Sequence, residues 1–216
     1  MDDLRAHINK LREDFSQGIL TEKDADANPA EQFKLWLQQA VESRVTEVQA
    51  MDLCTVSPEG KPSSRIVYMR EFNNNNYWFY TNYNSRKAQD LQKNPNVCAT
   101  FFWKELERQV RIEGKVTKAT AAESDAYFNA RPFDSKIGAW ASEQSRALTS
   151  RDELEKKVEE LKNKYTPENI KRPDFWGGYI ITANYYEFWQ GRKSRLHDRI
   201  IYTQSDAIWK IRRLFP

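Results

Sequence analysis

The chain has 216 residues, with 34 Lys or Arg and 31 Asp or Glu, so its formal net charge is only +3. This length suits one large domain or two small ones, and so small a charge argues against a general nucleic-acid coat protein. The sequence contains no run of about 18 apolar residues, so no transmembrane helix is predicted. The charged start MDDLRAHINKLREDF is unlike a signal peptide. Local clusters of cations would therefore have to bind any anion.

The first segment of the chain predicts a helical arm. Leu4, Ile8, Leu11 and Phe15 recur at helical spacing, and Gly18 can end that helix. We interpret residues 1–18 as an N-terminal helical arm or lid, followed by a polar connector over residues 19–28.

A second helix is predicted after this connector. Asn28 is a suitable N-cap, and Pro29 is favoured in the first turn. The apolar face of this helix is expected to contain Phe33, Trp36, Leu37, Ala40 and Val41.

From Met51 the pattern changes to short segments rich in β-forming residues. Turn signals such as SPEGKP, NNNN and KELE separate the predicted strands at 51–56, 63–72, 77–82, 96–103 and 108–116. Helices are predicted at 85–94, 120–130 and about 150–164, and strands return at 173–183, 186–190, 199–203 and 207–214. This order predicts an α+β fold, an antiparallel meander that closes into a barrel with helices around it, and one domain over residues 19–216.

The two cysteines, Cys54 and Cys98, lie in the apolar, strand-like segments. No Cys-x-x-Cys or His/Cys spacing is present, so we expect two buried thiols, no disulfide and no metal site. Such thiols are typical of a reducing compartment, and we expect a cytoplasmic protein with neither a membrane nor a nucleic acid as its partner.

Arg65 and Arg70 lie in the otherwise apolar segment SSRIVYMR. A buried guanidinium needs a partner, because burying a charge alone is very costly. Simple strand alternation places residues five apart on opposite faces, so a shared ligand requires a bulge or a ligand that reaches around an edge. The alternative is a pair of solvated arginines at a sheet edge.

A second cationic cluster begins a helix. Ser85, Arg86 and Lys87 follow a strand and a polar loop, where free amides and the helix dipole favour phosphate. The segment has no glycine-rich loop, so neither a Walker nor a Rossmann motif applies. Ordinary charges at a helix start are the alternative.

A third cluster lies in the segment YFNARPFDSKIGAWASEQS. Tyr127 and Arg131 are four residues apart and share a helix face, Pro132 ends that helix, and Ser135 follows in the turn. A Tyr, an Arg and a Ser at one helix end predict a second phosphate site; a simple helix-terminal cation is the alternative.

The fourth cluster is GRKSRLHDRI, residues 191–200, which follows the aromatic YYEFWQ. If this segment is extended, Arg195, His197 and Arg199 share one face and repel one another unless an anion lies there. A solvated basic edge is the alternative. Because these cations alternate with buried-looking strands, an exposed single-strand nucleic-acid groove is disfavoured.

Taken together, the clusters and their flanking segments resemble the pyridoxamine 5′-phosphate oxidase family. The resemblance is carried, in order and at family spacing, by RIVYMR, FYTNYNSRKAQDL, FFWKELERQVRIEGKV, YFNARPFDSKIGAWASEQS, FWGGY and EFWQGRKSRLHDR. It covers about Leu11 to Pro216, including the ending WKIRRLFP.

This resemblance implies an FMN-binding split β-barrel, antiparallel and Greek-key-like with flanking helices, that forms a homodimer with FMN at the subunit interface. It implies oxidation of pyridoxine 5′-phosphate or pyridoxamine 5′-phosphate to pyridoxal 5′-phosphate, in vitamin B6 salvage or biosynthesis. A hydride would pass from C4′ to flavin N5, and O2 would reoxidise the flavin and yield H2O2.

The resemblance also implies residue roles. The FMN-binding residues would be Arg65, Ile66, Val67, Tyr68, Met69, Arg70, Tyr80, Thr81, Arg86, Lys87, Gln109, Gln144, Ser145, Trp189 and Arg199. The substrate-binding residues would be Arg12, Arg70, Tyr127, Arg131, Ser135, Arg195, Leu196 and His197. Arg195 and His197 would also act in catalysis, by orienting the C4′ substituent or by helping to remove its proton.

The chain departs from the family at two of these places. Many relatives have Lys where this chain has Arg70, and many bacterial relatives have Tyr where it has Phe15. Two other functions stay open: a related split-barrel flavoprotein with another substrate, and a non-catalytic carrier of FMN or pyridoxal 5′-phosphate. The Tyr127, Arg131 and Ser135 trio argues against the first of these.

Overall fold

The computed structural model describes residues 2–11, 14–206 and 208–216, apart from the side chains of residues 2, 3 and 9. The chain divides into two compact units. The first unit contains residues 1–48, 100–112 and 185–216, and the second contains residues 49–99 and 113–184.

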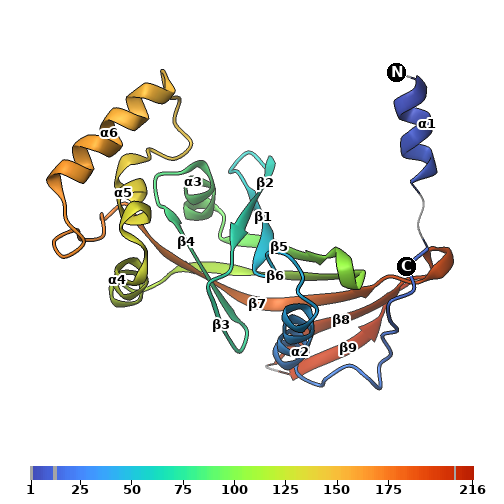
Figure 1. The fold of residues 1–216 in the computed structure, drawn as a ribbon. Helices are drawn as coiled ribbons and strands as arrows, with labels where there is room; N and C mark the ends of the chain where they lie inside the picture. Colours follow the sequence, from blue (N-terminus) through green and yellow to red (C-terminus); the bar gives the residue numbers. More distant parts are fainter. Residues whose placement is uncertain (1, 12–13, 207) are drawn as a thin grey trace. The chain divides into compact units, whose positions relative to one another are not determined.

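The described strands form one nine-stranded sheet. They are β1 (Ala50–Val56), β2 (Pro62–Tyr68), β3 (Glu71–Asn73), β4 (Asn76–Asn82), β5 (Asn96–Trp103), β6 (Arg108–Lys118), β7 (Trp176–Gln190), β8 (Asp198–Ser205) and β9 (Ile208–Arg213). Their order is β2-β1-β5-β6-β7-β4-β3, with β8 paired to β7 and β9 paired to β8 (Figure 1). Strand β7 pairs with β4 through its first half and with β8 through its second half. The first half belongs to the second unit and the second half to the first unit.

The hairpins of the second unit form where turn residues predict them. Gly60, in the turn between β1 and β2, has a φ of 77°, and Asn74, between β3 and β4, has a φ of 49°. Glycine and asparagine are the residues that adopt this left-handed conformation most readily. The registers Val56↔Pro62 and Asn73↔Asn76 therefore close directly on the SPEGKP and NNNN turns.

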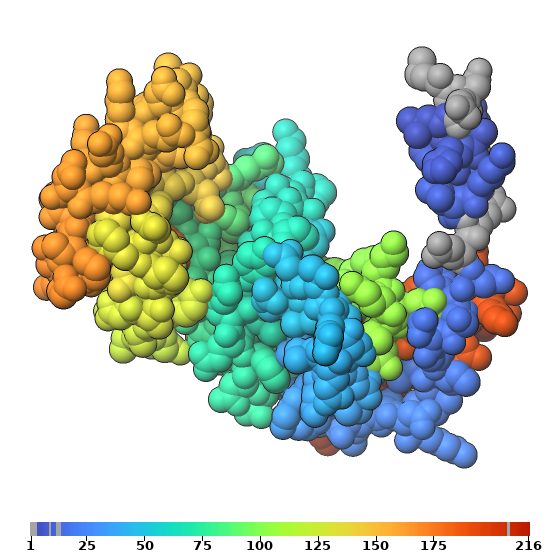
Figure 2. Space-filling view, in the orientation of Figure 1, coloured from blue at the N-terminus to red at the C-terminus, as the bar shows by residue number. Residues whose placement is uncertain are grey.

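Four α-helices belong to the second unit: α3 (Arg86–Lys93), α4 (Ala121–Ala130), α5 (Phe133–Ala141) and α6 (Arg151–Lys164). Helix α4 begins with a capping box, in which Thr120 and Glu123 each bind the other's backbone N–H. Helix α6 has no buried residue, and Figure 2 shows its orange surface exposed.

Helix α5 was not expected from the sequence. Pro132 ends the preceding helix as expected, but it also stands directly before α5 as its N-cap residue, and Ser135 lies in the first turn of this helix and not in a loop. Ile137 and Ala139 of α5 pack with Phe128 and Trp176 in a buried cluster. Burial of such apolar side chains, worth about 1.5–3 kcal/mol for each large one, stabilises a short helix that has little signal of its own.

The first unit contains α1 (Asp2–Lys10), α2 (Pro29–Glu42) and two short 3-10 helices, η1 (Lys104–Leu106) and η2 (Lys193–Arg195). Helix α2 begins as expected, because the side chain of Asn28 accepts a hydrogen bond from the N–H of Ala30 at 3.0 Å. Phe33 and Trp36 are buried, and Trp36 contacts Phe188 edge to face at a centroid distance of 5.2 Å. Val41 was wrongly placed on the apolar face, since it is 57% exposed.

Helix α1 is shorter than the apolar spacing predicts. It ends at Lys10, so Phe15 and Gly18 lie outside it. Phe15 packs instead against Trp189 and His197, at centroid distances of 5.7 and 5.5 Å. The N–H groups of the two residues that follow Phe15 donate to the carboxylate of Glu107, which gives this backbone hydrogen bonds that a helix would otherwise supply.

The structure also bears on the expectations about transmembrane helices and about the two cysteines. Among the described residues, each helix is too short or too polar to cross a bilayer. Cys54 and Cys98 are half-buried and not fully buried, because they lie on the less covered faces of β1 and β5.

Candidate functional site

The second unit contains a cavity of about 940 Å³, in the upper part of the range that is usual for ligand sites. It gathers most of the residues that the sequence nominated in this unit. These are Arg65, Ile66, Val67, Tyr68, Arg70, Tyr80, Thr81, Arg86, Lys87, Tyr127, Arg131, Ser135, Gln144 and Ser145.

Arg65 and Arg70 line the same cavity although strand alternation predicted opposite faces. Strand β2 ends at Tyr68, and the chain turns before β3 begins at Glu71, so Arg70 does not follow the alternation of β2. The guanidinium of Arg65 donates to the carbonyl of Leu53 at 3.1 Å and to the hydroxyl of Thr55 at 2.8 Å. Asp90 in turn accepts from Thr55 at 2.7 Å, so a buried carboxylate holds Arg65 through a hydroxyl.

Lys87 is a buried cation that lines this cavity. It is 7% exposed, and its ammonium donates to Thr81 at 3.1 Å and to the amide oxygen of Gln144 at 2.9 Å. Burial, and then repulsion from Arg65, lower its pKa to about 8. In the described part of the chain Lys87 makes no ion pair with a carboxylate, so its charge is uncompensated and suits an anion at the start of α3.

Arg131 is a second cation in the same cavity, and its side chain is half-buried. It is the C-cap residue of α4, in extended backbone, and it is not on the helix face that it was expected to share with Tyr127. Its Nη1 atom is buried and has no hydrogen-bond partner among the described residues. Burial lowers its pKa, nearby Arg70 lowers it further, and Tyr127 opposes the shift.

The cavity also has an aromatic wall that the sequence only partly identified. Tyr80 and Tyr127 stack at 3.8 Å between centroids, and Trp176 lies parallel to both at 5.8 and 6.2 Å. The guanidinium carbon of Arg131 lies 4.6 Å from the centroid of Trp176. Trp176 belongs to the FWGGY segment, but no binding role was predicted for it from the sequence. Asn82 and Ser142 also line the cavity, and no role was predicted for them either.

The cations of the cavity therefore fall into two groups. Arg65, Arg86 and Lys87 interact electrostatically with one another, since Arg86 lowers the pKa of Arg65 and Arg65 lowers that of Lys87, each after a larger effect of burial. Arg70 and Arg131 form the other group. Two such groups can bind two phosphates or one doubly anionic ligand, and the aromatic wall can pack against flat rings.

Several nominated residues are not part of this cavity. Met69 is 6% exposed, packs in the core and does not line it. Arg12 lies outside the described residues. The others belong to the first unit: Gln109, Trp189, Arg195, Leu196, His197 and Arg199.

The segment GRKSRLHDRI is not continuously extended. Residues Lys193–Arg195 form η2, and β8 begins only at Asp198, so Arg195 and His197 do not alternate with Arg199 on one strand face. Two cations of the segment are also compensated within the fold. Arg199 donates to the buried carboxylate of Glu187 at 2.7 Å, and Arg192 donates to Asp198 at 2.9 Å.

His197 and Trp189 lie close together in the first unit, with ring centroids 4.6 Å apart. Arg195 and Leu196 are exposed beside them. Burial, and then the charge of Arg195, lower the pKa of His197, and Asp198 opposes this shift. These side chains form a second group of candidate binding residues, in the first unit.

Comparisons with known proteins agree with this arrangement. The crystal structure of PhzG from Burkholderia lata, in complex with tetrahydrophenazine-1-carboxylic acid, superposes with a TM-score of 0.86 at 28% identity, over 93% of this chain and 100% of that chain. A pyridoxamine 5′-phosphate oxidase-related, FMN-binding protein from Nostoc punctiforme superposes with a TM-score of 0.69 at 17% identity, over 85% of this chain and 97% of that chain. The predicted split β-barrel is thus confirmed as the fold.

Sequence comparison then gives the family. Residues 37–165 match the family model described as pyridoxamine 5′-phosphate oxidase, and residues 176–216 match the pyridoxine 5′-phosphate oxidase C-terminal dimerisation region. A pyridoxine/pyridoxamine 5′-phosphate oxidase of Cytophaga hutchinsonii is 49% identical over 216 residues, which covers 99% of this chain and 100% of the relative. The chain belongs to the pyridoxamine 5′-phosphate oxidase family of FMN-binding oxidoreductases, and its dimerisation region supports a homodimer.

Proposed function

We propose that the chain is an FMN-dependent oxidase that converts pyridoxine 5′-phosphate or pyridoxamine 5′-phosphate to pyridoxal 5′-phosphate. Bound FMN would supply the redox chemistry, as the acceptor of a hydride from C4′ that O2 regenerates with formation of H2O2. The alcohol substrate loses a proton to water, and the amine substrate consumes water and releases ammonia.

The observation that carries this proposal is a pair of cations without a carboxylate partner in one cavity of about 940 Å³: Lys87, which is buried, and Arg131, which is half-buried with a buried, unpartnered Nη1. Burial lowers the pKa of each, and neither has a carboxylate partner in the described part of the chain. Bound phosphate would offset the cost of burying each of them. Two phosphorylated, flat ligands match two cationic groups beside an aromatic wall.

The residues present fit FMN at the group around Lys87. Its ammonium, the hydroxyl of Thr81 and the guanidinium of Arg65 and of Arg86 offer the donors for a phosphate monoester. The start of α3 adds the positive end of a helix dipole. Gln144 accepts from the Lys87 ammonium at 2.9 Å and, with Ser145, lines the cavity, so both would complete this subsite.

Arg131 would hold the substrate phosphate together with Tyr127 and Ser135. The buried, unpartnered Nη1 of Arg131 is a donor already placed in the cavity. Arg70, which lowers the pKa of Arg131, would contribute to the same end. Binding the phosphate far from the reacting C4′ would orient the ring, and binding energy from a remote group is what positions a substrate for reaction.

The residues of the first unit would act in the same reaction from a second copy of the chain. The C-terminal segment that carries Trp189, Arg195, His197 and Arg199 matches a dimerisation region, and Leu196 within it is 68% exposed. We place FMN between the two copies, with Gln109 as a further donor to the flavin edge. Arg195 and His197 would contact the substrate ring.

A substrate comparison tests this function. The chain reconstituted with FMN and given pyridoxine 5′-phosphate in air should form pyridoxal 5′-phosphate and H2O2 in equal amounts. Unphosphorylated pyridoxine has the same reacting carbon but no group for Arg131, so it should react far more slowly. Equal rates with the two compounds, or no peroxide with either, would contradict the proposal.

A further inference from the structure

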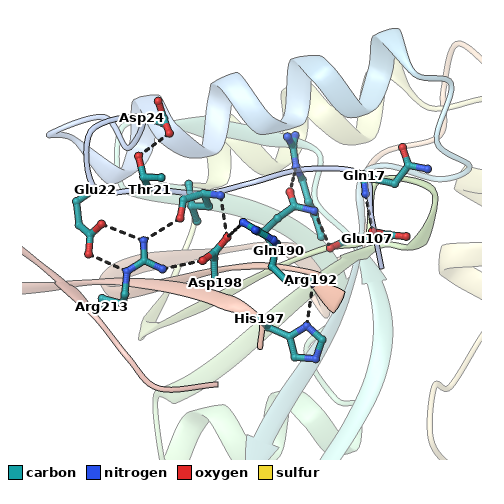
Figure 3. Close-up of polar contacts among 12 residues, drawn as sticks. Gln17, Thr21, Glu22, Asp24, Glu107, Gln190, Arg192, His197, Asp198 and Arg213 are labelled. Atoms are coloured by element: carbon teal, nitrogen blue, oxygen red, sulfur yellow. Dashed lines mark hydrogen bonds and ion pairs between the residues drawn. The ribbon is translucent and has the colours of Figure 1, made fainter. Parts of the chain in front are cut away.

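The ring of His197 has one of its two nitrogens already engaged by the backbone. The N–H of Arg192 donates to Nδ1 of His197 at 3.1 Å (Figure 3). A backbone N–H can only donate, so Nδ1 must be an unprotonated acceptor. In a neutral imidazole the proton then lies on the other nitrogen, Nε2.

The residue that makes this bond is itself held in place by its side chain. The guanidinium of Arg192 donates to Asp198 Oδ2 at 2.9 Å, directly after the histidine in the chain. Asp198 Oδ1 accepts from Arg213 at 2.8 Å, and Asp198 Oδ2 also accepts from the N–H of Leu20 at 3.1 Å. One carboxylate therefore joins both ends of the 192–198 turn to β9 and to the connector after α1.

The outer end of this network is a two-point ion pair. Arg213 donates to both oxygens of Glu22, at 2.8 and 2.9 Å, and to the carbonyl of Leu20 at 2.9 Å. Figure 3 shows Arg213 directed at Glu22 on one side and at Asp198 on the other. We call Glu22, Arg213, Asp198 and Arg192 the turn clamp.

The turn that the clamp holds is strained. Ser194 and Arg195 have φ values of 56° and 63°, in the left-handed region that side chains with a Cβ disfavour. Consecutive residues in this region persist only where the surrounding structure fixes them. The clamp supplies such fixed points on both sides of the strained residues.

The charged groups around His197 also favour its neutral form. Burial lowers the pKa of the imidazole, the charge of Arg195 lowers it further, and the carboxylate of Asp198 acts in the opposite direction. That carboxylate is shared by Arg192 and Arg213, which reduces the negative field it presents to the ring. Protonation of Nδ1 would in addition break the bond from Arg192.

From this geometry we infer that His197 is held as the neutral Nε2–H tautomer and acts as a hydrogen-bond donor, not as a base, with the turn clamp as its positioning device. The inference rests on the proposed function for the placement of His197 at the substrate. Its Nε2–H would donate to a lone pair of an oxygen or nitrogen on the substrate ring or its C4′ substituent. It has no free lone pair for the C4′ hydroxyl proton, which must leave to water.

The tautomer can be observed directly because the chain has only two histidines, His7 and His197. Long-range 1H–15N spectra of the 15N-labelled FMN holoenzyme near neutral pH, with His7→Gln for assignment, report both ring nitrogens of His197. We expect Nε2 to be protonated and Nδ1 to be unprotonated. A proton on Nδ1, or on both nitrogens, would overturn the inference even if pyridoxal 5′-phosphate is formed normally.

Two substitutions separate a donor from a base. His197→Asn keeps an N–H donor but cannot accept a proton at that position, whereas His197→Leu has neither function. We expect kcat/KM to fall by less than about 10-fold for His197→Asn and by roughly 10- to 100-fold more for His197→Leu, the range for losing one hydrogen bond in a transition state. Equal losses in the two variants, with normal FMN content, would overturn the donor role.

The positioning role of the clamp is tested away from the ring. In Glu22→Gln the outer ion pair is lost, and we expect the spectrum of His197 to broaden or to show a second, Nδ1-protonated population. Glu143→Gln is the matched control, because Glu143 is an equally exposed glutamate with arginine and lysine partners in the other unit. A His197 spectrum that is the same in both variants would show that the clamp does not position the ring.

Discussion

Two cations of the second unit and two cations of the first unit have pKa values that are shifted in opposite directions. In the second unit, the buried Lys87 and the half-buried Arg131 have no carboxylate partner in the described structure, and both have a lowered pKa. In the first unit, Arg199 and Arg213 bind the carboxylates of Glu187, Glu22 and Asp198, and both have a raised pKa. The pKa directions therefore separate cations that lack a partner from cations whose partner belongs to the fold.

This difference has a simple physical meaning. A cation without a partner makes the empty protein less stable and is available to an anionic ligand, whereas a paired cation stabilises the fold and has little left for a ligand. Removing an unpaired cation should weaken ligand binding without loss of stability, whereas breaking the ion pair of a paired cation should reduce stability with less effect on ligand binding. The predictions below use this contrast, and they run from the largest expected effect to the smallest.

Arg131→Met should have the largest effect on activity. We expect kcat/KM for pyridoxine 5′-phosphate to fall roughly 100- to 1,000-fold, because removing one member of a buried charge pair costs about 2–5 kcal/mol. FMN content should not change, and the free energy of unfolding of the apoprotein should not fall. Steady-state kinetics measure kcat/KM, and urea denaturation measures the free energy of unfolding. Arg151→Met, on the exposed face of α6, is the control.

Lys87→Met should weaken FMN binding roughly 10- to 100-fold at neutral pH, the effect of one hydrogen bond to a charged group. Its pH dependence gives a second measurement. In the empty cavity Lys87 loses its proton as the pH rises through about 8, and a bound phosphate raises this pKa, so FMN binding takes up a proton. The affinity of the wild-type chain should therefore fall above about pH 8, as followed by flavin fluorescence quenching.

In the Lys87→Met variant this alkaline decrease should be absent. A decrease of the same size in the variant would show that another group causes the loss of FMN affinity at alkaline pH, and it would contradict the assignment of Lys87 as an unpaired cation that binds FMN.

Asp198→Asn should act mainly on stability, because Asp198 accepts from two guanidinium groups and one backbone N–H. We expect the free energy of unfolding to fall by about 1–3 kcal/mol, the cost of leaving charged donors with a weaker acceptor. FMN affinity should change less than in Lys87→Met. If Asp198→Asn left the free energy of unfolding unchanged but abolished FMN binding, the turn clamp would belong to the binding site.

Glu22→Gln should have the smallest effect at neutral pH and a clearer one in acid. Hydrogen bonding to Arg213 is the main reason why the pKa of Glu22 is lowered from 4.5 to about 2. A lowered carboxyl pKa contributes stability that is complete above 4.5 and is lost as the pH falls toward 2. The difference in Tm between wild type and variant should therefore shrink across this interval, which thermal unfolding at several pH values measures.

The sequence predicted much of the fold because local signals agreed with the final packing. Asn28 and Pro29 mark the start of α2, and the NNNN turn gives the β3–β4 hairpin. Helix α5 had no such signal, since its stability comes from packing of Ile137 with residues distant in the chain, including Trp176. The early end of α1 likewise depends on the contact of Phe15 with Trp189, which no local pattern records.

The cations of the cavity were easier to interpret from the sequence than the cations of the C-terminal segment. Counting cations along the chain identified Lys87 and Arg131 correctly as cavity residues. The same count in GRKSRLHDRI could not include Glu187, the carboxylate that the fold brings to Arg199. Charge clusters in a sequence therefore indicate a ligand only where the fold supplies no counter-charge.

The central claim is that one cavity with two cationic groups holds FMN and a phosphorylated B6 substrate together. An anaerobic single-turnover experiment tests it most directly: the FMN holoenzyme is mixed with pyridoxine 5′-phosphate and the flavin absorbance is followed. We predict that the flavin is bleached while one pyridoxal 5′-phosphate forms for each FMN, and that Arg131→Met slows this step without loss of FMN. A flavin that stays oxidised in the presence of excess substrate would contradict the account.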